Sequence, residues 1–346
     1  MGWTMGDNTS IEWTDATWNP IRGCSRVSSG CTACYAEKIA ARFSGLGKPY
    51  EGLAAMTSAG PRWTGEVRFV EEALDLPLRW KKPRRIFVNS MSDLFHEKVA
   101  DEWIDRIFHV MWQATQHVFQ VLTKRPERML DYMSNPNTPA GKPLPNVWLG
   151  VSVENQETAD ERIPLLLQTP AAVRFLSVEP LLSEVNVRPW LRLWYYACGW
   201  EGQEATLMAA SGGQLVCPKC GGSGGLLFKY QSPISWVIVG GESGPQARPC
   251  RVAWVRGVVQ QCAAAGVPCF GKQLGANIVD RNDAFGGWES DQWPQELDPD
   301  RVEHNIHGYR EEHQGADCRI RLRDGKGGDW SEWPEDLRVR QFPQGA

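Results

Sequence analysis

The feature that most limits the fold of this chain is a regular alternation of short apolar runs with amphipathic helical stretches. Runs such as VWLGV and WVIV are nearly continuous in apolar residues, as strands covered on both faces require. Strands are predicted at residues 17–21, 85–89, 117–123, 147–153, 173–178, 236–240 and 268–272. Helices are predicted at residues 34–43, 101–116, 126–133, 158–168 and 252–265. This alternation implies parallel strands that are joined by right-handed crossovers.

The pattern predicts an α/β fold whose main body is a complete or partial parallel (β/α) barrel. A doubly wound open sheet shows the same alternation and is the alternative. The barrel is predicted to have a first part, residues 1–182, which carries a cysteine cluster, and a last part, residues 234–276. Residues 183–233 are predicted to form an insertion between them, and residues 277–346 a loop-rich C-terminal extension.

Composition narrows the class of protein. The chain has 346 residues and a net charge of −4, so it has no global basic field that would draw it onto nucleic acid or an anionic membrane. Its N-terminus lacks the basic and apolar regions of a secretory signal. No apolar run approaches the roughly 20 residues of a membrane span. We therefore expect a cytoplasmic protein with no membrane partner.

Three cysteines lie close together where the first predicted strand gives way to a helix. Cys24, Cys31 and Cys34 have the spacing Cys-x6-Cys-x2-Cys. Three thiolates can each bind one iron of a [4Fe–4S] cluster, which leaves the fourth iron without a protein ligand. A helix that begins near Cys34 would direct its first N–H groups at the cluster and stabilise the thiolates. The alternatives are a structural zinc site, completed by a ligand such as His96, or ordinary buried cysteines.

At these cysteines the chain resembles the radical SAM superfamily, and more closely a set of phage-associated proteins of unknown function with a three-cysteine motif. The superfamily motif is usually Cys-x3-Cys-x2-Cys, so this chain has extra residues between its first two cysteines. Ala33 stands where an aromatic residue often precedes the third cysteine, and Tyr35 follows that cysteine. The resemblance covers about residues 10–276. It implies that a [4Fe–4S] cluster reductively cleaves S-adenosylmethionine (SAM) to methionine and a 5′-deoxyadenosyl radical.

Polar side chains follow several predicted strands directly, at the strand ends where (β/α) barrels place their chemistry. The resemblance implies that residues there hold SAM. Lys124 or Arg125 is expected to pair with its carboxylate, because a charge-assisted hydrogen bond suits that group. Ser152 and Glu154 are candidates for the ribose hydroxyls, and residues 90–93 for the amino group. The complete set predicted to bind the cofactor is Ser90, Ser92, Asp93, Lys124, Arg125, Ser152, Glu154, Glu179, Glu242 and Lys272.

Cysteines later in the chain suggest two further sites. Cys269 lies in the last predicted strand and is expected to face the barrel, where it could donate a hydrogen atom to a product radical. In the insertion, Cys217 and Cys220 form a CPKC turn that is typical of a zinc knuckle, with Cys198 as a third ligand. A glutamate, Glu201 or Glu204, would have to complete that zinc site. An auxiliary iron–sulfur cluster and a metal-free loop are the alternatives.

These observations predict a radical SAM enzyme that acts on an unidentified substrate. The phage-associated resemblance favours a modified nucleobase in phage DNA, or its precursor, and implies an electron donor such as flavodoxin or ferredoxin. The rival hypothesis is a zinc-binding, non-catalytic module that binds nucleic acid and has kept a barrel scaffold. A metal-assisted hydrolase would need a His-rich site, and the six histidines are scattered along the chain.

The cluster hypothesis predicts the effect of one substitution. Replacing Cys31 with Ala removes one of three iron ligands and should abolish both cluster binding and SAM cleavage. Iron, sulfide and cleaved SAM are measured on the anaerobically reconstituted protein. A Cys31→Ala protein that retains iron and still cleaves SAM would contradict the assignment.

Overall fold

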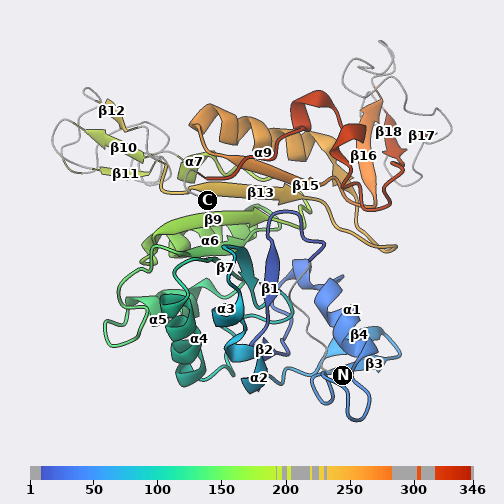
Figure 1. The fold of residues 1–346 in the computed structure, drawn as a ribbon. Coiled ribbons are helices and arrows are strands. Elements are labelled where there is room, and N and C mark those ends of the chain that lie inside the picture. The colour runs from blue at the N-terminus through green and yellow to red at the C-terminus, as the bar shows by residue number, and fades with distance from the viewer. Residues whose placement is uncertain are drawn as a thin grey trace. The chain divides into compact units, whose positions relative to one another are not determined.

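The central element of the computed structural model is a seven-stranded sheet (Figure 1). The structure describes residues 9–191, 193–196, 201–203, 219, 226–229, 232–282, 302–304 and 316–343. The strand order is β1-β6-β7-β8-β9-β13-β15. The strands are β1 (Ala16–Trp18), β6 (Arg85–Val88), β7 (Val118–Thr123), β8 (Val147–Ser152), β9 (Val173–Val178), β13 (Trp236–Gly240) and β15 (Cys269–Gln273).

The sheet confirms the predicted α/β class. Neighbouring strands pair in parallel from β1 to β9, and β13 pairs in parallel with β15. In the described residues β1 and β15 are the two edges, so the barrel is a partial one. The helices are α1 (Tyr35–Arg42), α2 (Glu71–Leu74), α3 (Leu76–Arg79), α4 (Asp101–Gln113), α5 (Pro126–Ser134), α6 (Gln156–Gln168), α7 (Arg188–Leu191) and α9 (Val252–Ala265). None of the described helices is long and apolar enough to cross a membrane.

Four smaller sheets accompany the central one. Two antiparallel pairs are β2 (Ile21–Arg22) with β5 (Arg68–Phe69), and β3 (Ala54–Thr57) with β4 (Gly60–Trp63). The predicted insertion contains three antiparallel strands, β10 (Leu193–Tyr196), β11 (Glu201–Gln203) and β12 (Leu226–Lys229). The fourth sheet contains β14 (Cys250–Arg251), β16 (Ile278–Asn282), β17 (Val302–His304) and β18 (Ala316–Ile320). The predicted C-terminal extension thus contributes three strands as well as loops.

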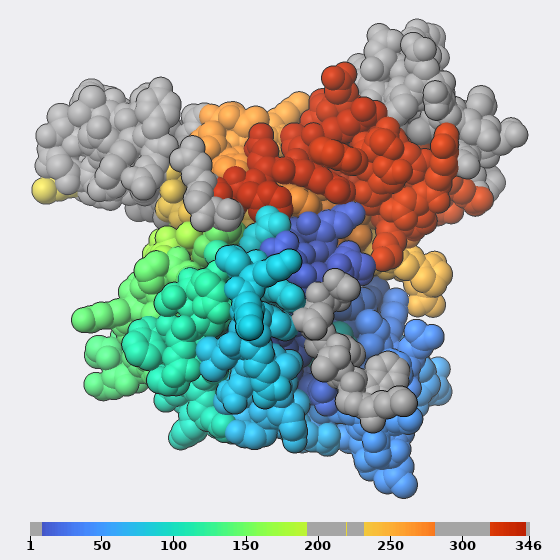
Figure 2. All heavy atoms as spheres, in the orientation of Figure 1, coloured from blue at the N-terminus to red at the C-terminus, as the bar shows by residue number. Residues whose placement is uncertain are grey.

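The chain divides into two compact units. Unit 1 contains Met1–Ser152 and Asp160–Ser177, and unit 2 contains Val153–Ala159 and Val178–Gly345. On the face of unit 1 in Figure 2, cyan atoms lie between blue and green ones. This agrees with the strand order, in which β6 lies between β1 and β7. The predicted four-part division of the chain stays a prediction.

The register of unit 1 separates its strand residues into two faces. On one face Trp18 contacts Phe119, with ring centroids 5.7 Å apart, and its indole N–H donates to the Ala73 carbonyl oxygen at 2.7 Å. Because Ala73 belongs to α2, this is the helix-covered face. Side chains alternate along a strand, so the neighbouring positions point to the opposite, interior face. The paired positions on that face include Thr17, Phe87, Gln120, Trp148, Gly150, Phe175, Ser152 and Ser177.

Apolar rings fill the interior face of unit 1 below its polar strand ends. Trp13, just before β1, packs on Phe87 with ring centroids 4.8 Å apart. A Cβ atom at Gly150 would lie 2.6 Å from the ring of Phe175, so this ring occupies the space that a larger residue would need. Phe175 is fully buried and cannot swing into solvent. Glycine at position 150 is therefore a packing requirement.

Replacing Gly150 with Ala should lower the free energy of unfolding by about 1–3 kcal/mol, the usual cost of overpacking a tight core. The matched control is Gly257→Ala in α9, where an added methyl meets only Gln261 Nε2, at 4.0 Å. There, the gain in helix propensity should leave stability equal or higher. Urea unfolding of both variants measures the difference. Equal stability of the two variants would contradict the packing of Phe175 over Gly150.

Candidate functional site

The three clustered cysteines lie in a loop of unit 1 that begins at a required glycine. Gly23 has φ +95°, and a Cβ atom there would lie 2.1 Å from the Glu66 carbonyl oxygen. Only glycine fits such a position, so the chain can turn sharply just before Cys24. The 3-10 turn η1 (Ser29–Cys31) then leads to the second cysteine. Cys24, Cys31 and Cys34 are all free thiols of intermediate exposure.

Cys34 occupies the N-cap position of α1. Burial raises the pKa of its thiol, and the backbone N–H groups of Glu37 and Ala36 oppose that rise. Neither N–H completes a capping hydrogen bond to the sulfur. The Lys124 ammonium also favours a negative charge on Cys34. Burial thus outweighs the first turn of the helix and the one cation, which both favour a thiolate at this position.

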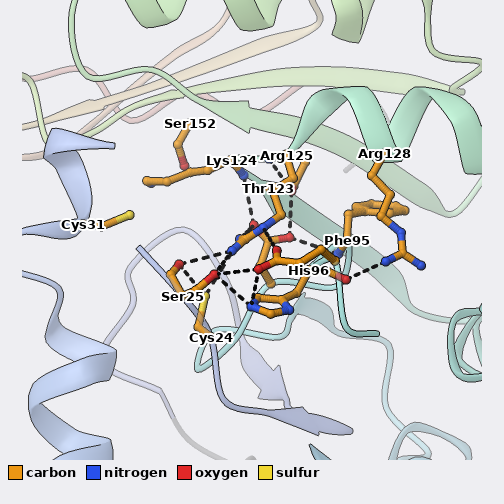
Figure 3. Close-up of polar contacts among 12 residues, drawn as sticks. Cys24, Ser25, Cys31, Phe95, His96, Thr123, Lys124, Arg125, Arg128 and Ser152 are labelled. Carbon is orange, nitrogen blue, oxygen red and sulfur yellow. Dashed lines mark hydrogen bonds and ion pairs between the residues drawn. The ribbon is translucent and has the colours of Figure 1, made fainter. Parts of the chain in front are cut away.

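Cys24 is next to the most heavily bonded arginine of unit 1 (Figure 3). Arg125 Nη1 lies 4.0 Å from the Cys24 sulfur and 3.1 Å from Asp93 Oδ2. Arg125 Nη2 donates to Ser25 Oγ at 2.7 Å, and Nε donates to Glu97 at 3.0 Å. Burial, and next the charge of Asp93, raise the pKa of the Cys24 thiol to about 12, and the Arg125 charge acts against that rise. All three guanidinium nitrogens of Arg125 are therefore used in contacts that join the cysteine loop to Asp93 and Glu97.

Asp93 is the partner that fixes Arg125. Its side chain is buried, and Oδ1 accepts from Thr123 Oγ1 at 2.7 Å and from the Phe95 N–H at 3.0 Å. Oδ2 accepts from the Lys124 N–H and from Arg125 Nη1, both at 3.1 Å. The carboxylate thus joins the loop after β6 to the end of β7. Asp93 makes four hydrogen bonds inside the protein, so its role is to hold the backbone and side chains of the site in place.

His96 has a defined tautomer. Its Nδ1 accepts from the Lys98 N–H at 3.1 Å, so the proton of the neutral ring is on Nε2, which donates to Ser25 Oγ at 2.9 Å. Burial, and next the Arg125 charge, lower the pKa of His96, which keeps the ring neutral. Both ring nitrogens are engaged. His96 is therefore not available as the fourth ligand of a zinc site in this arrangement.

Lys124 and Arg125 follow the last residue of β7, and Arg125 is bonded to Asp93. Thr123 pairs with Val151, so extending the register by one residue brings Lys124 level with Ser152 on the interior face. Ser152 pairs with Ser177 of β9, which continues a polar row across the interior face. The role of either cation toward the SAM carboxylate stays a prediction.

The serines after β6 hold the backbone of neighbouring segments. Ser90 Oγ exchanges hydrogen bonds of 3.2 Å with the Asn19 side chain, and Ser92 Oγ donates to the Ile21 carbonyl oxygen at 2.9 Å. Asn89 is a residue that sequence reasoning left out of the predicted set. It is 3% exposed with φ +58°, and its Nδ2 has no hydrogen-bond partner. A buried amide donor at the end of a strand is available to a bound molecule.

The four remaining predicted cofactor residues belong to unit 2. Lys272 Nζ lies 2.5 Å from Glu179 Oε1, so these two residues pair with each other. Both Glu242 oxygens bind the Arg248 guanidinium, at 2.7 and 3.1 Å. Glu154 is fully buried, and its N–H donates to Thr158 Oγ1 at 3.0 Å. Their predicted roles toward SAM stay predictions.

The candidate hydrogen donor Cys269 lies at the start of β15 and is 3% exposed. It contacts Cys262 of α9, whose pKa is raised first by the hydrogen bond with Cys269 and next by burial. This is the setting of a packed core thiol, and the donor role stays a prediction. The second cysteine group, Cys198, Cys217 and Cys220, lies outside the described residues. Within the described ranges, no three His, Cys, Asp or Glu side chains are arranged to hold a single metal ion.

Comparisons with known proteins give a family and distant structural likenesses. A family model described as "Protein of unknown function (DUF5131)" matches residues 8–332. Spore photoproduct lyase complexed with dinucleoside spore photoproduct is 9% identical, over 93% of this chain and 73% of that chain, with a TM-score of 0.39. A mutant of spore photoproduct lyase with bound AdoMet and dinucleoside spore photoproduct is 10% identical, over 93% and 72%, with a TM-score of 0.38.

The match to another mutant of spore photoproduct lyase is shorter. It is 11% identical, spans 52% of this chain and only half of that chain, 50%, and has a TM-score of 0.34. The comparison with curated proteins finds no match. We therefore derive the function from the residues of the chain itself.

The network around Asp93 makes a prediction about stability. Asp93→Asn replaces one acceptor oxygen with an NH2 group, which then faces N–H or O–H donors and deprives Arg125 of its buried carboxylate partner. The free energy of unfolding should fall by about 3–5 kcal/mol. Glu97→Gln is the matched control. Glu97 is the second carboxylate that pairs with Arg125, and the Glu97 side chain is 61% exposed. That change should cost less than about 1 kcal/mol. Urea unfolding of the metal-free proteins measures both, and equal losses would refute the central role of Asp93.

Proposed function

We propose a function for this chain, which belongs to the DUF5131 family of proteins of unknown function, from the site that its own residues build. The chain is a radical SAM enzyme. Cys24, Cys31 and Cys34 hold a [4Fe–4S] cluster, and residues at the interior strand ends of unit 1 hold SAM. The observation that carries this proposal is the set of three free thiols in the segment from Cys24 to the N-cap of α1, with Arg125 Nη1 4.0 Å from the Cys24 sulfur.

The donor set fits a cluster with one open iron. Three free thiols are present in one segment of unit 1, from Cys24 to the N-cap of α1. Positive groups lie beside them, with Arg125 at Cys24 and Lys124 at Cys34. A three-thiolate cluster carries negative charge, so these groups favour its binding. A zinc site with His96 as the fourth ligand is disfavoured, because both nitrogens of that ring are already bonded.

When bound, the cluster supplies the electron that cleaves SAM into methionine and a 5′-deoxyadenosyl radical. Lys124 pairs with the SAM carboxylate, because it is the strand-end cation on the interior face of unit 1. Ser152 and the Asn89 amide offer hydrogen bonds to polar atoms of SAM. The buried rings of Trp148 and Phe175 line the interior face and exclude water from the reactive region.

For the substrate we propose a nucleobase, either in nucleic acid or as a precursor. The resemblance of the three-cysteine motif to phage-associated proteins supports this class. A small acidic electron carrier, such as flavodoxin or ferredoxin, supplies the reductant. The rival function, a non-catalytic zinc-binding module for nucleic acid, needs zinc where the proposed enzyme needs iron and sulfide.

Metal analysis and EPR spectroscopy test the proposal directly. The protein is purified and reconstituted without oxygen, and its iron, sulfide and zinc are quantified. The dithionite-reduced sample should give a [4Fe–4S] signal that shifts when SAM is added, because SAM binds the open iron. Zinc without sulfide, together with no effect of SAM, would replace the enzyme with the rival binding module.

The role of Lys124 gives a separate prediction. Lys124→Met removes a charge-assisted hydrogen bond worth about 1.5–3 kcal/mol, so the Kd for SAM should rise roughly 10- to 100-fold at unchanged iron content. Lys98→Met is the matched control, because Lys98 pairs with the exposed Glu66. Equilibrium binding of SAM to the reconstituted proteins measures the effect. Equal affinities of the two variants would exclude Lys124 as the carboxylate ligand.

A further inference from the structure

The loop between the first two cysteines carries more residues than the usual motif, and the structure shows how it is held. It runs from Ser25 to Gly30 and contains the first residues of η1. Ser28 Oγ lies 4.0 Å from the Cys31 sulfur, which is the polar contact that the loop itself makes with that thiol. Two further restraints on the loop come from charged side chains that bind Ser25 and Arg26.

The first restraint is an ion pair between Arg26 and Glu37, a residue of the first turn of α1 that is 1% exposed. Arg26 Nε donates to both Glu37 oxygens at 3.1 Å, and Nη2 binds Oε2 as well. Nη2 also donates to the Thr32 carbonyl oxygen at 3.2 Å. Glu37 Oε1 accepts from the Trp63 N–H at 2.8 Å, so the pair is tied to the β3–β4 hairpin.

The second restraint is the pair of Arg125 with Asp93, which holds the start of the same loop. Arg125 Nη2 donates to the Ser25 carbonyl oxygen at 3.2 Å and to Ser25 Oγ at 2.7 Å. We call these two pairs, Arg26 with Glu37 and Arg125 with Asp93, the arginine clamps. Each clamp anchors the loop to a buried carboxylate through a forked guanidinium, a geometry that lysine cannot reproduce.

The arginine clamps also bring charge to the thiols. Arg125 Nη1 lies 4.0 Å from the Cys24 sulfur. Arg26 Nη2 donates to the carbonyl oxygen of Thr32, which stands between Cys31 and Cys34 in the sequence. One arginine therefore contacts a cysteine sulfur, and the other binds the backbone between the remaining two cysteines.

We propose that Arg26 and Arg125 are positioning residues that hold the expanded cysteine loop in shape and set the reduction potential of the cluster. This inference rests on the proposed function, because it concerns the group that the three cysteines hold. Reduction adds a negative charge to the cluster, and a nearby cation stabilises that charge. Net charge and hydrogen bonds to the ligand sulfurs are established controls of cluster potential. Loss of either arginine charge should make reduction harder.

The test is a redox titration of reconstituted protein, monitored by EPR. Arg26→Met removes the charge and the forked hydrogen bonds together, and its midpoint potential should shift to a more negative value than that of the wild-type protein. Arg26→Lys and Arg125→Lys keep the charge and lose the fork. They should retain a potential nearer to wild type while iron and sulfide content fall, because the loop is held less firmly.

Arg106→Met is the matched control. Arg106 pairs with Glu71 through two nitrogens on an exposed surface, and no cysteine is among its charge partners. Its potential and iron content should equal those of the wild-type protein. Far-UV circular dichroism of each variant separates a local effect from loss of fold.

The outcomes separate the two hypotheses. Arg26→Met protein with wild-type potential and wild-type iron content would overturn the role of the clamps and leave the proposed enzyme standing. A folded Arg26→Met protein that loses iron and sulfide, or that shifts in potential while Arg106→Met does not, would support it. Wild-type protein that takes up no iron and sulfide would instead refute the proposed function itself.

Discussion

The carboxylate of Asp93 accepts four hydrogen bonds in the interior of unit 1, and much of the candidate site depends on them. Through Thr123 and the Lys124 backbone it fixes the end of β7. Through Arg125 it reaches Ser25 and Cys24, which lie about 70 residues before Asp93 in the chain. A buried ion pair contributes little net stability, because desolvation offsets its attraction. Its value here is geometric, since it decides where the first cysteine lies.

The fold could be predicted from the sequence because both of its signals are local. Apolar runs such as those at 173–178 and 236–240 match β9 and β13 at both ends. Helix α9 spans the predicted residues and ends at Gly266, which adopts a left-handed conformation with φ +68°. Only the choice between a barrel and an open sheet needed the structure, because closure depends on which strands become edges. The short antiparallel pairs were missed, since strands of two to four residues leave no periodic pattern.

The candidate site was predictable in its residue types and not in its geometry. Two cations follow β7 in the sequence, and nothing in the composition decides which of them faces the interior. The structure distinguishes them, because Arg125 is bonded to Asp93, while extending the β7 register by one residue brings Lys124 level with Ser152. Glu37 shows the same limit, because an acidic residue in the first turn of a helix usually lies in solvent. Here Glu37 is 1% exposed, and it binds Arg26 and the Trp63 N–H of the β3–β4 hairpin.

The loop with the three cysteines owes its shape to contacts with residues far along the chain, from Trp63 to Arg125. These contacts need the pairing of β6 with β7 and the packing of α1 on its hairpin. In the proposed enzyme, iron and sulfide would therefore enter a loop that the fold already shapes. Small zinc fingers work in the opposite way, because metal binding drives their folding. Maturation of the proposed enzyme would thus be a delivery problem, in which a carrier has to reach thiols that a finished fold holds.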